Sequence, residues 1–336
     1  MKTTWLALPA LMIGATSAFA GETTYPLSIE NCGRTLTFET QPERVVSIGQ
    51  ASTEMLYELG LGTNVAGTAV WFNEVDAKYK DVNDKVERLN DNAPSFESVL
   101  NKKPQLVSSQ YEWYVGAEGS VGTHEQFETL GVQSYTLPSD CVGKDNSTGG
   151  DGTRTEKFSM DSIYTGLTQL STMFNAQDAG KKAVSELQAR FDAAVARAKA
   201  VDAKDLSAVV WFSSPDQQAD AYVAGQKGVP GYMLNEMGIR NVIKTDEEWP
   251  IVGWETISKA NPDVIILARM DRRRRPMDDY KLKLEFLKSD PVTSQLDAVV
   301  NDRIIIVDAH AIQPSVRIAT GLETIASALE EFDLKK

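Results

Sequence analysis

Aromatic and cationic side chains gather where the strands predicted from this 336-residue sequence end. Four tryptophans occupy such positions, and a run of four arginines, residues 272–275, follows another predicted strand. Arginine suits anion recognition because its planar guanidinium group binds a carboxylate through two parallel hydrogen bonds. Aromatic rings add apolar and stacking surface. These residue types therefore predict binding of a ligand that has anionic and planar or apolar parts.

The candidate ligand-binding residues come from both halves of the chain. Ligands of open parallel sheets meet the loops at the carboxyl ends of the strands, so we expect these loops to line one cleft. The alternatives are core packing for any single aromatic ring and a solvated turn for the arginine run. The candidates are Gln50, Trp71, Phe72, Tyr111, Trp113, Trp211, Trp249, Arg272, Arg273, Arg274 and Arg317.

Catalytic and metal-binding motifs are absent from the sequence. It has no G-x-S-x-G nucleophile elbow, P-loop, Rossmann glycine fingerprint or H-E-x-x-H. His310 with Asp308 matches part of a catalytic triad, but no serine is marked out as its nucleophile. A bare-metal site needs several His and carboxylate ligands, and the chain has two histidines, His124 and His310, in different halves. We expect a binding protein without a cofactor.

The first twenty residues have the features of a secretory signal peptide. Lys2 precedes an apolar run over residues 5–13, and Ala18-Phe19-Ala20 forms a cleavage site before Gly21. No cysteine lies near this cut, so no lipid anchor is expected there. We expect a mature protein outside the cytoplasm, in the periplasm.

The charge and the cysteines fit that compartment. The net charge is −13, and loss of Lys2 with the signal peptide makes it −14, which argues against nucleic-acid binding. The two cysteines, Cys32 and Cys141, are expected to form one disulfide, with two free thiols as the alternative.

Short apolar runs alternate with helical patterns along most of the chain, as in a parallel α/β sheet. A hairpin is predicted over 25–38, and residues 140–157, which are rich in Gly and Asp, are predicted to form a long loop. The predicted strands cover 44–48, 65–70, 104–109, 132–137, 208–212, 263–268 and 303–307. The predicted helices cover 52–59, with Ser52 as the cap, 96–102, 125–130, 231–237, 254–259, 282–287 and 314–332.

The stretch from 160 to 200 predicts a short helix, a break near Asn175, and one long helix over 176–201. Asn175 is the expected N-cap, and Asp178 follows in the first turn. Apolar residues then recur every three or four positions, which indicates one buried stripe. This helix could lie on the surface of a single domain or join two domains.

A short internal repeat favours two domains. Phe96-Glu97-Ser98-Val99 precedes a strand led by Pro104, and Trp254-Glu255-Thr256-Ile257 precedes one led by Pro262. The two glutamates lie seven residues before their prolines. From the residues alone, Glu97 and Glu255 could simply favour the N-terminal ends of their helices.

Several motifs resemble those of the periplasmic iron-siderophore and vitamin B12 binding proteins of ABC importers. The likeness covers almost all of the mature chain. The motifs are Glu43-Arg44-Val45-Val46-Ser47-Ile48, the stretch from Ser52 to Gly62, Phe96–Val99 with Lys103–Val107, and Asn261-Pro262-Asp263-Val264-Ile265-Ile266.

The resemblance implies an α/β fold with two Rossmann-like α/β lobes joined by one long helix. The expected boundaries are 21–158 for the first lobe, 159–205 for the helix pair, and 206–336 for the second lobe. It also implies a monomer that captures a ferric siderophore between its lobes and docks on an inner-membrane ABC permease through Glu97 and Glu255. Haem or cobalamin is the alternative ligand, with Tyr111, Tyr114 and His310 as possible haem ligands. A secreted enzyme is a distant alternative.

Overall fold

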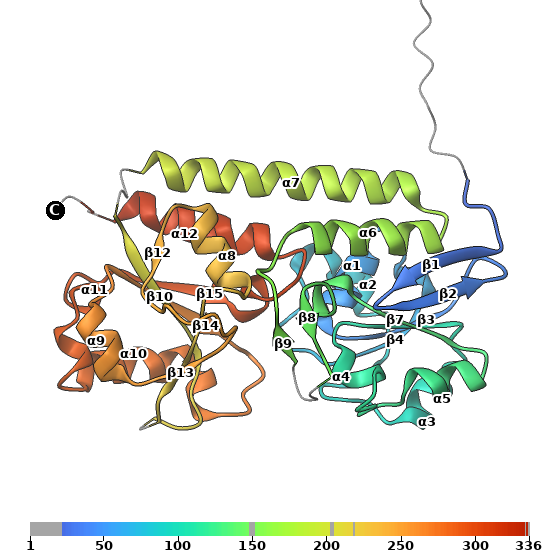
Figure 1. Ribbon diagram of the computed structural model, residues 1–336, viewed down its shortest axis with the longest axis horizontal. Helices are drawn as coiled ribbons and strands as arrows, with labels where there is room; N and C mark the ends of the chain where they lie inside the picture. Colours follow the sequence, from blue (N-terminus) through green and yellow to red (C-terminus); the bar gives the residue numbers. More distant parts are fainter. Residues whose placement is uncertain (1–21, 148–151, 202–204, 218, 333, 335–336) are drawn as a thin grey trace, which may run out of the picture.

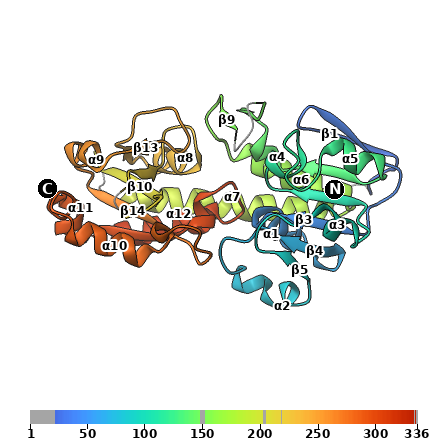
Figure 2. The same ribbon diagram turned by 90° about the horizontal axis from the view of Figure 1, so that it is seen from below.

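Two separate sheets and one long helix, α7 (Gln177–Ala200), organise the chain (Figure 1). The computed structural model describes residues 22–147, 152–201, 205–217, 219–332 and 334. The predicted signal peptide therefore lies outside the described residues. The predicted fold class is confirmed, because two α/β lobes flank a long helix that spans both (Figure 2).

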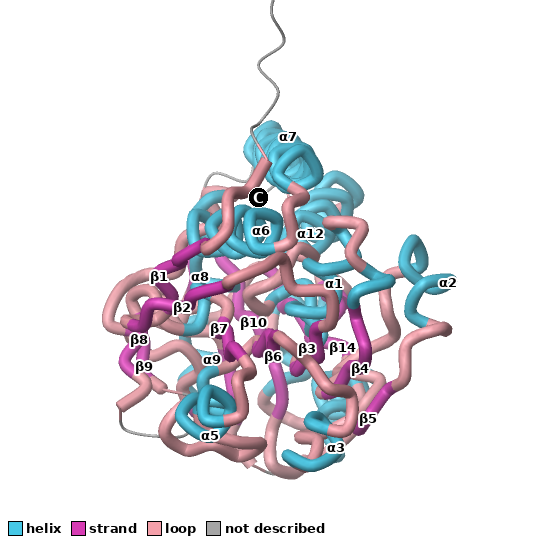
Figure 3. Tube along the Cα trace, turned by 90° about the vertical axis from the view of Figure 1, so that its right-hand side faces the viewer, coloured by secondary structure: helices cyan, strands magenta, loops and turns pink. Residues whose placement is uncertain are grey.

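The first lobe, here the N-lobe, is built on a five-stranded parallel sheet in the order β5-β4-β3-β6-β7. Two of its central strands are buried along their whole length, as expected for a parallel sheet covered on both faces. Helices α1 and α6 lie on one face, and α3 and α5 lie on the other (Figure 3). The strands are β3 (Val45–Ile48), β4 (Val65–Ala69), β5 (Arg88–Asn90), β6 (Leu106–Ser109) and β7 (Gln133–Thr136). The helices are α1 (Gln50–Glu58), α2 (Lys80–Asn83), α3 (Phe96–Leu100), α4 (Glu112–Val115), α5 (His124–Thr129) and α6 (Asp161–Met173).

The second lobe, here the C-lobe, has a mixed six-stranded sheet in the order β13-β11-β10-β14-β15, with β12 also paired to β10. Strand β11 runs antiparallel to β10, and the edge strand β13 runs antiparallel to β11; both are too short and irregular to show in the sequence pattern. The strands are β10 (Ser207–Ser213), β11 (Ala221–Val223), β12 (Arg240–Asn241), β13 (Ile251–Val252), β14 (Val264–Arg269) and β15 (Ile304–Asp308). The helices are α8 (Val229–Glu236), α9 (Trp254–Ala260), α10 (Tyr280–Ser289), α11 (Asp297–Val300) and α12 (Ile318–Glu331).

Two hairpins and several 3-10 turns complete the chain. The predicted N-terminal hairpin is present as β1 (Leu27–Asn31) and β2 (Arg34–Phe38). The segment predicted as a long loop contains a small hairpin, β8 (Lys144–Asp145) and β9 (Thr153–Arg154). The 3-10 helices are Gly62–Asn64, Ala77–Tyr79, Pro138–Asp140, Pro276–Asp278, Thr293–Gln295 and Ala309–Ile312.

One apolar cluster runs through both lobes along the inner face of α7. Leu187 and Phe191 of α7 are buried in it together with residues of α6 on one side and α12 on the other. Burial of such surface stabilises by roughly 25 cal/mol per Å2, so the stripe holds α7 against both lobes at once. With 24 residues, α7 is about 36 Å long.

Asn175 ends α6 and does not cap α7, so the N-cap prediction was wrong. Its backbone has a φ of 52°, and the next amide, of Ala176, donates back to the carbonyl of Ser171 at 2.7 Å. Asn tolerates this left-handed conformation, which commonly closes a helix C-terminus. The Asn175 side chain instead accepts a hydrogen bond from the backbone N–H of Thr23. Asp178 does lie in the first turn of α7.

Ser52 is not a helix cap, because α1 begins two residues earlier. Gly49 takes the capping position with a φ of 118°, and a Cβ atom there would lie 2.2 Å from Cβ of Gln110. Glycine is therefore required for α1 to start directly at the end of β3. Ser52 is buried inside α1, where its hydroxyl lies 2.7 Å from that of Ser108. The lobe boundaries at residues 158 and 205 stay predictions.

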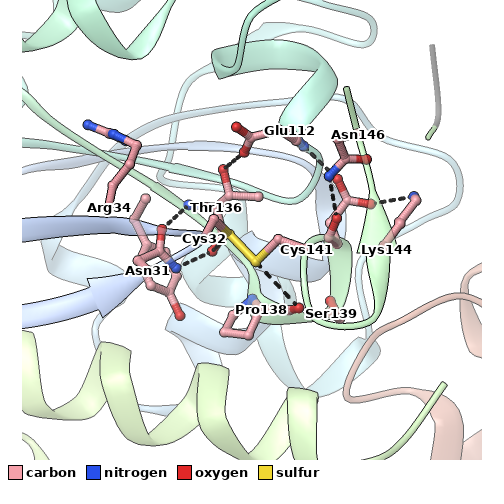
Figure 4. The surroundings of a disulfide bond; sticks show 12 residues. Asn31, Cys32, Arg34, Glu112, Thr136, Pro138, Ser139, Cys141, Lys144 and Asn146 are labelled. Atoms are coloured by element: carbon pink, nitrogen blue, oxygen red, sulfur yellow. Dashed lines mark hydrogen bonds and ion pairs between the residues drawn. A yellow bond between two sulfur atoms is a disulfide. The ribbon is translucent and has the colours of Figure 1, made fainter. Parts of the chain in front are cut away.

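The predicted disulfide is present between Cys32 and Cys141, whose Cα atoms are 5.5 Å apart (Figure 4). It ties the turn of the β1–β2 hairpin to the chain that follows β7. Beside it, the Asn31 side chain exchanges two hydrogen bonds with the backbone of Thr136, at 2.7 and 3.0 Å. The hairpin is thus fixed to the edge of the N-lobe sheet by the disulfide, by these two hydrogen bonds and by a third from Arg34 to the carbonyl of Ser134 at 3.1 Å.

Replacing both Cys32 and Cys141 by Ala is expected to lower the free energy of unfolding. The cross-link spans 109 residues, and closing a loop of that size stabilises by up to ~4–5 kcal/mol in the chain-entropy model. Urea unfolding followed by circular dichroism measures the difference. Wild-type protein unfolded with a reductant should match the double variant, and an unchanged wild-type midpoint under reduction would contradict the prediction.

Candidate ligand-binding cavity between the lobes

A cavity of about 580 Å3 lies between the two lobes. This volume is in the range of small-molecule binding sites. Six of its nine lining residues are aromatic and two are arginines, and none of these nine is acidic. They are Phe72, Tyr111, Trp113 and Tyr114 from the N-lobe and Phe212, Trp249, Arg274, Arg275 and Gln313 from the C-lobe.

The N-lobe wall is the aromatic segment 111–114 at the start of α4, and Glu112 anchors it. One oxygen of Glu112 lies 2.9 Å from Nε2 of His124. The other accepts from the Thr136 hydroxyl at 2.5 Å (Figure 4). Burial opposes ionisation of Glu112, but hydrogen bonds from His124 and Thr136 outweigh it and lower the pKa. Glu112 therefore stays charged and holds the neighbouring rings of Tyr111 and Trp113 at the cavity.

His124 also lies 2.7 Å from the hydroxyl of Ser134, which completes a Ser–His–Glu chain. Ser134 is fully buried in β7 and does not line the cavity. A nucleophile must reach its substrate, so this chain of hydrogen bonds is structural.

The C-lobe wall combines stacked rings with two cations. The rings of Phe212 and Trp249 pack with their centroids 4.7 Å apart. Arg274 and Arg275 come from the segment after β14, and their backbone N–H groups both donate to Asp278. The carboxylate of Asp278 thus fixes the backbone of these two lining residues. The guanidinium group of Arg274 donates to Asn92, and that of Arg275 lies 4.9 Å from the ring of Tyr222.

Arg272 and Arg273, also candidates, lie outside the cavity lining. Arg272 reaches the N-lobe, where its guanidinium group lies 4.6 Å from the ring of Phe72 and donates to Asn92 at 3.1 Å. Arg273 forms an ion pair with Asp279 at 2.8 Å. The four arginines predicted as one anion site are therefore divided among three places. Two line the cavity, Arg272 lies at the lobe interface, and Arg273 lies at the start of α10.

Strand geometry separates the four tryptophans predicted to line the cleft. Side chains alternate between the two faces of a strand. Phe212 faces the cavity, so its neighbour Trp211 faces the core, where it packs 4.6 Å from Trp254. Trp71 is likewise buried, with its indole N–H donating to Thr68, while Phe72 lines the cavity. The structure brings Trp113 and Trp249 to the cavity and leaves Trp71 and Trp211 inside the lobes.

Arg317 forms a buried ion pair across the lobes and does not line the cavity. Its Nε and Nη2 donate to the two oxygens of Glu54 at 2.7 and 2.5 Å, and Nη1 donates to Asp308 at 3.1 Å. Glu54 is fully buried in α1 of the N-lobe, whereas Arg317 precedes α12 of the C-lobe. Burial opposes the charge on Arg317, but the hydrogen bonds that Arg317 donates to Glu54 outweigh it and raise the pKa of Arg317. This group of residues, with Asn73, is called the inter-lobe ion cluster below.

Gln50 and Asn73 extend the ion cluster. The buried Gln50 side chain accepts from the backbone N–H groups of Phe72 and Asn73, at 3.1 Å each, and donates to Glu54. Asn73 then donates to Asp308 of the C-lobe at 2.5 Å. Gln50 is a predicted ligand-binding residue that instead holds the loop bearing Phe72 in place.

His310 is fully buried behind Phe72, and the two rings stack at 6.5 Å. Neither ring nitrogen has a hydrogen-bond partner among the described residues. Burial and the positive charge of Arg317 lower its pKa to about 3, so the ring is neutral at neutral pH. Asp308 accepts from the backbone N–H of His310, not from the ring, so the two do not form the partial triad considered from the sequence.

A further contact between the lobes lies next to Trp249 of the cavity wall. Arg154 of β9 donates to Glu248 at 3.0 Å and to the carbonyl of Ser139 at 2.9 Å. Glu248 precedes Trp249, so the segment predicted only as a loop reaches the C-lobe wall. In the described part of the chain, no group of three or more His, Cys, Asp or Glu could hold a metal ion, and no helix could cross a membrane.

Sequence signals for the remaining lining residues were weak. Phe212 and Gln313 line the cavity but were not among the candidates, whereas Tyr114 was considered only as a haem ligand and Arg275 only as part of the arginine run. Strand alternation next to Trp211 could have indicated Phe212. Nothing in the sequence pattern marks Gln313.

Two α/β lobes, a long connecting helix and a cavity between the lobes define a substrate-binding protein of a transport system. The chain belongs to the periplasmic binding protein family, whose model matches residues 45–311. Members of this family bind substrates outside the cytoplasm for ABC transporters and are not enzymes, and this holds for the present chain.

Known relatives agree with this assignment. The chain is 23% identical over 307 residues to the uncharacterized ABC transporter substrate-binding lipoprotein YvrC of Bacillus subtilis, covering 91% of this chain and 86% of that one. A periplasmic binding protein of Veillonella parvula has a TM-score of 0.74 at 23% identity, with 94% and 100% of the two chains covered. A structure described as an ABC-type Fe3+-hydroxamate transport system, from Saccharomonospora viridis, has a TM-score of 0.71 at 24% identity, with 91% and 99% covered. A periplasmic haem-binding protein of Pseudomonas aeruginosa has a TM-score of 0.66 at 16% identity, with 88% and 94% covered.

Burial of neutral His310 is expected to make the protein less stable in acid. The folded pKa of about 3 lies below the ordinary value of 6.5, so between these values the unfolded chain binds a proton that the folded chain does not. The free energy of unfolding should therefore fall as the pH drops through this window. His310→Phe, which keeps a ring beside Phe72, should show a shallower decline in urea unfolding at pH 7, 6, 5 and 4. Equal slopes for the two proteins would contradict the prediction.

Proposed function

We propose that this protein captures an anionic ferric siderophore in the periplasm and delivers it to the permease of an ABC importer. The observation that supports this ligand class is the composition of the cavity. Six aromatic rings surround it, and Arg274 and Arg275 supply two positive charges with no acidic residue among the nine lining residues. The chain as a whole has a net charge of −13, so the positively charged lining of the cavity contrasts with the acidic protein around it.

Electrostatics and shape both favour such a ligand. Two guanidinium groups between apolar walls attract carboxylate or catecholate oxygens more strongly than the same groups in open water. The rings of Tyr111, Trp113, Phe212 and Trp249 offer flat surfaces to the organic part of a chelate. The Saccharomonospora viridis structure is by its description an Fe3+-hydroxamate transport system, and Fe3+-hydroxamates belong to the same broad class of iron chelates.

Haem is the second candidate, and one observation favours it. Two phenols, those of Tyr111 and Tyr114, line the cavity, and tyrosine is a known axial ligand of haem iron. Haem is also planar and carries two carboxylates that the arginines could bind. His310 is a poorer candidate ligand, because Phe72 covers it and it is fully buried. Cobalamin remains the third ligand to test.

A ligand screen with arginine variants tests the anionic class. We expect one of ferric citrate, a ferric tris-catecholate, a ferric tris-hydroxamate, haem and cobalamin to raise the melting temperature and quench tryptophan fluorescence. Arg274→Ala and Arg275→Ala should each weaken that ligand about tenfold or more, since a charge-assisted hydrogen bond is lost.

Arg273→Ala is the matched control for the arginine variants. Arg273 lies in the same run but pairs with Asp279 outside the cavity lining, so its loss should change affinity less than about twofold. Equal effects of all three substitutions would argue against a specific anion site. Preferred binding of haem or cobalamin would replace the siderophore proposal with that ligand.

We infer that Glu97 and Glu255 dock on the permease. Each is exposed in the first turn of its helix, α3 or α9, and its carboxylate makes no hydrogen bond or ion pair with another described residue. Both helices lie on the side of their sheets away from α7 (Figure 1). Glu255 also borders a groove of about 790 Å3, whose walls include Trp254 and Phe286 and whose acidic residues are Asp220, Glu255 and Asp290. Acidic surfaces of this kind favour a basic partner.

Charge reversal separates docking from ligand binding. The Glu97→Lys/Glu255→Lys variant should abolish ligand uptake in cells, while the purified protein keeps its ligand affinity, because both residues lie outside the cavity lining. Glu186→Lys, on the exposed face of α7, is the control and should transport normally. Loss of ligand binding in the purified double variant, or normal uptake, would count against docking through these residues.

We infer a soluble periplasmic form, although the Bacillus subtilis relative is by name a lipoprotein. A lipid anchor of that kind needs a free cysteine, and Cys32 and Cys141 are bonded to each other. The mass of the mature protein tests this. A chain that begins at Gly21 without added lipid supports it, and a lipid-modified N-terminus would contradict it.

A further inference from the structure

Lys283 of α10 is fully buried, which is rare for lysine. Its ammonium group donates to the carbonyl of Ala268 at 2.7 Å and to the carbonyl of Phe212. The ring of Trp211 lies 5.6 Å away. The positive charge is therefore held between the carboxyl ends of the neighbouring strands β10 and β14.

These two strand ends carry the C-lobe wall of the cavity. Phe212 lines the cavity with its ring and gives its carbonyl to Lys283. The chain that leaves β14 just after Ala268 becomes the arginine segment 272–275. Lys283 thus lies behind the aromatic and the cationic parts of the wall at the same time.

Asp278 provides a second link between the same two parts. One of its oxygens accepts from the Ser213 hydroxyl at 2.5 Å, at the end of β10. The other accepts from the backbone N–H groups of Arg274 and Arg275, at 2.8 and 2.9 Å. Asp278 and Asp279 are the acidic groups that favour the charged form of Lys283. Lysine and carboxylates together connect β10, β14 and the arginine segment.

A charged side chain is not needed simply to join the ends of strands β10 and β14. Burial lowers the pKa of Lys283 to about 7, which shows that the ammonium form is disfavoured there. In the N-lobe, the equivalent strand ends are held by neutral amides. Gln110, after β6, accepts from the backbone N–H of Ala51 at 3.0 Å, and Gln50 holds the loop after β4. A buried ammonium group is the costlier solution, and it occurs in the lobe that supplies the cationic wall.

We propose that Lys283 is a positioning residue of the ligand cavity, which fixes Phe212 and the 272–275 segment in the geometry that the ligand requires. Only the affinity measurement that tests this inference rests on the proposed ligand-binding function. The structural part of the inference concerns the protein without ligand. Lys283 does not line the cavity and is not expected to touch the ligand.

Lys283→Met tests the proposal because it keeps the length of the side chain and removes its N–H donors. The probe is whichever of the five ligands named above binds wild-type protein. We expect the variant to bind it at least about tenfold more weakly, because Phe212 and the arginine segment lose their fixed position. Lys281→Met, on the exposed side of the same helix, should bind as wild type does.

Hydrogen exchange of the ligand-free proteins separates positioning from a general loss of stability. In Lys283→Met, peptides covering 208–214 and 264–275 should exchange faster, while peptides covering 44–59 of the N-lobe should exchange as in wild type. Lys283→Arg, which keeps N–H donors, should restore part of both the affinity and the protection. If Lys283→Met does not fold, the same comparison is made with Ser213→Ala, which removes one link to Asp278 and should loosen 272–275.

Three results would overturn the proposal. They are wild-type affinity in Lys283→Met, unchanged exchange over 264–275, and Lys283→Arg binding no better than Lys283→Met. The exchange measurement uses no ligand, so its result does not depend on the siderophore assignment. Failure of that assignment can therefore be told apart from failure of the Lys283 proposal.

Discussion

The buried ion pair between Glu54 and Arg317 fixes how the two lobes meet. Removing one partner of such a pair typically costs about 3–5 kcal/mol, because the other charge stays buried without compensation. Here the pair is supported by Asp308 on one side and Gln50 on the other. The lobes therefore cannot separate or slide at this point without exposing or isolating a charge.

The long helix supplies the second constraint on the lobes. Arg190 of α7 forms a bidentate ion pair with Glu323 of α12, and Arg197 forms one with Glu330. The two arginines are seven residues apart on α7, and the two glutamates are seven residues apart on α12, so the pairs repeat every two helical turns. These pairs are partly exposed, so each contributes little on its own, and the apolar stripe beneath them carries most of the stability. A continuous helix and a buried ion cluster together favour a preformed cavity with small rocking motions over wide hinge closure.

Much of the fold could be predicted from the sequence because it depends on local patterns. Apolar runs and helix periodicity located the main strands and helices of both lobes, and the short repeat around Glu97 and Glu255 indicated that the lobes are alike. Strands such as β5 and β13 carry too few apolar residues to show such a pattern. Asn175 was misjudged because the same side chain suits either end of a helix, and only the backbone shows which end it occupies.

The cavity was harder to predict than the fold. Residues of the aromatic loops line the cavity, but sequence does not show which of two adjacent residues faces outward, so Trp211 was chosen where Phe212 lines the cavity. Gln50 and Arg317 have the chemistry of ligand-binding residues. In the structure, however, they bind other groups of the protein that are distant in sequence. For the same reason, the role of Lys283 becomes visible only when β10, β14 and α10 are brought together.

Small-angle X-ray scattering of the ligand-free and ligand-saturated protein tests the central claim most directly. If the ion cluster and α7 hold the lobes around a preformed cavity, the radius of gyration should change by less than about 1 Å on binding. A contraction of several Å would show that the lobes close by a wide hinge motion, and it would contradict this account.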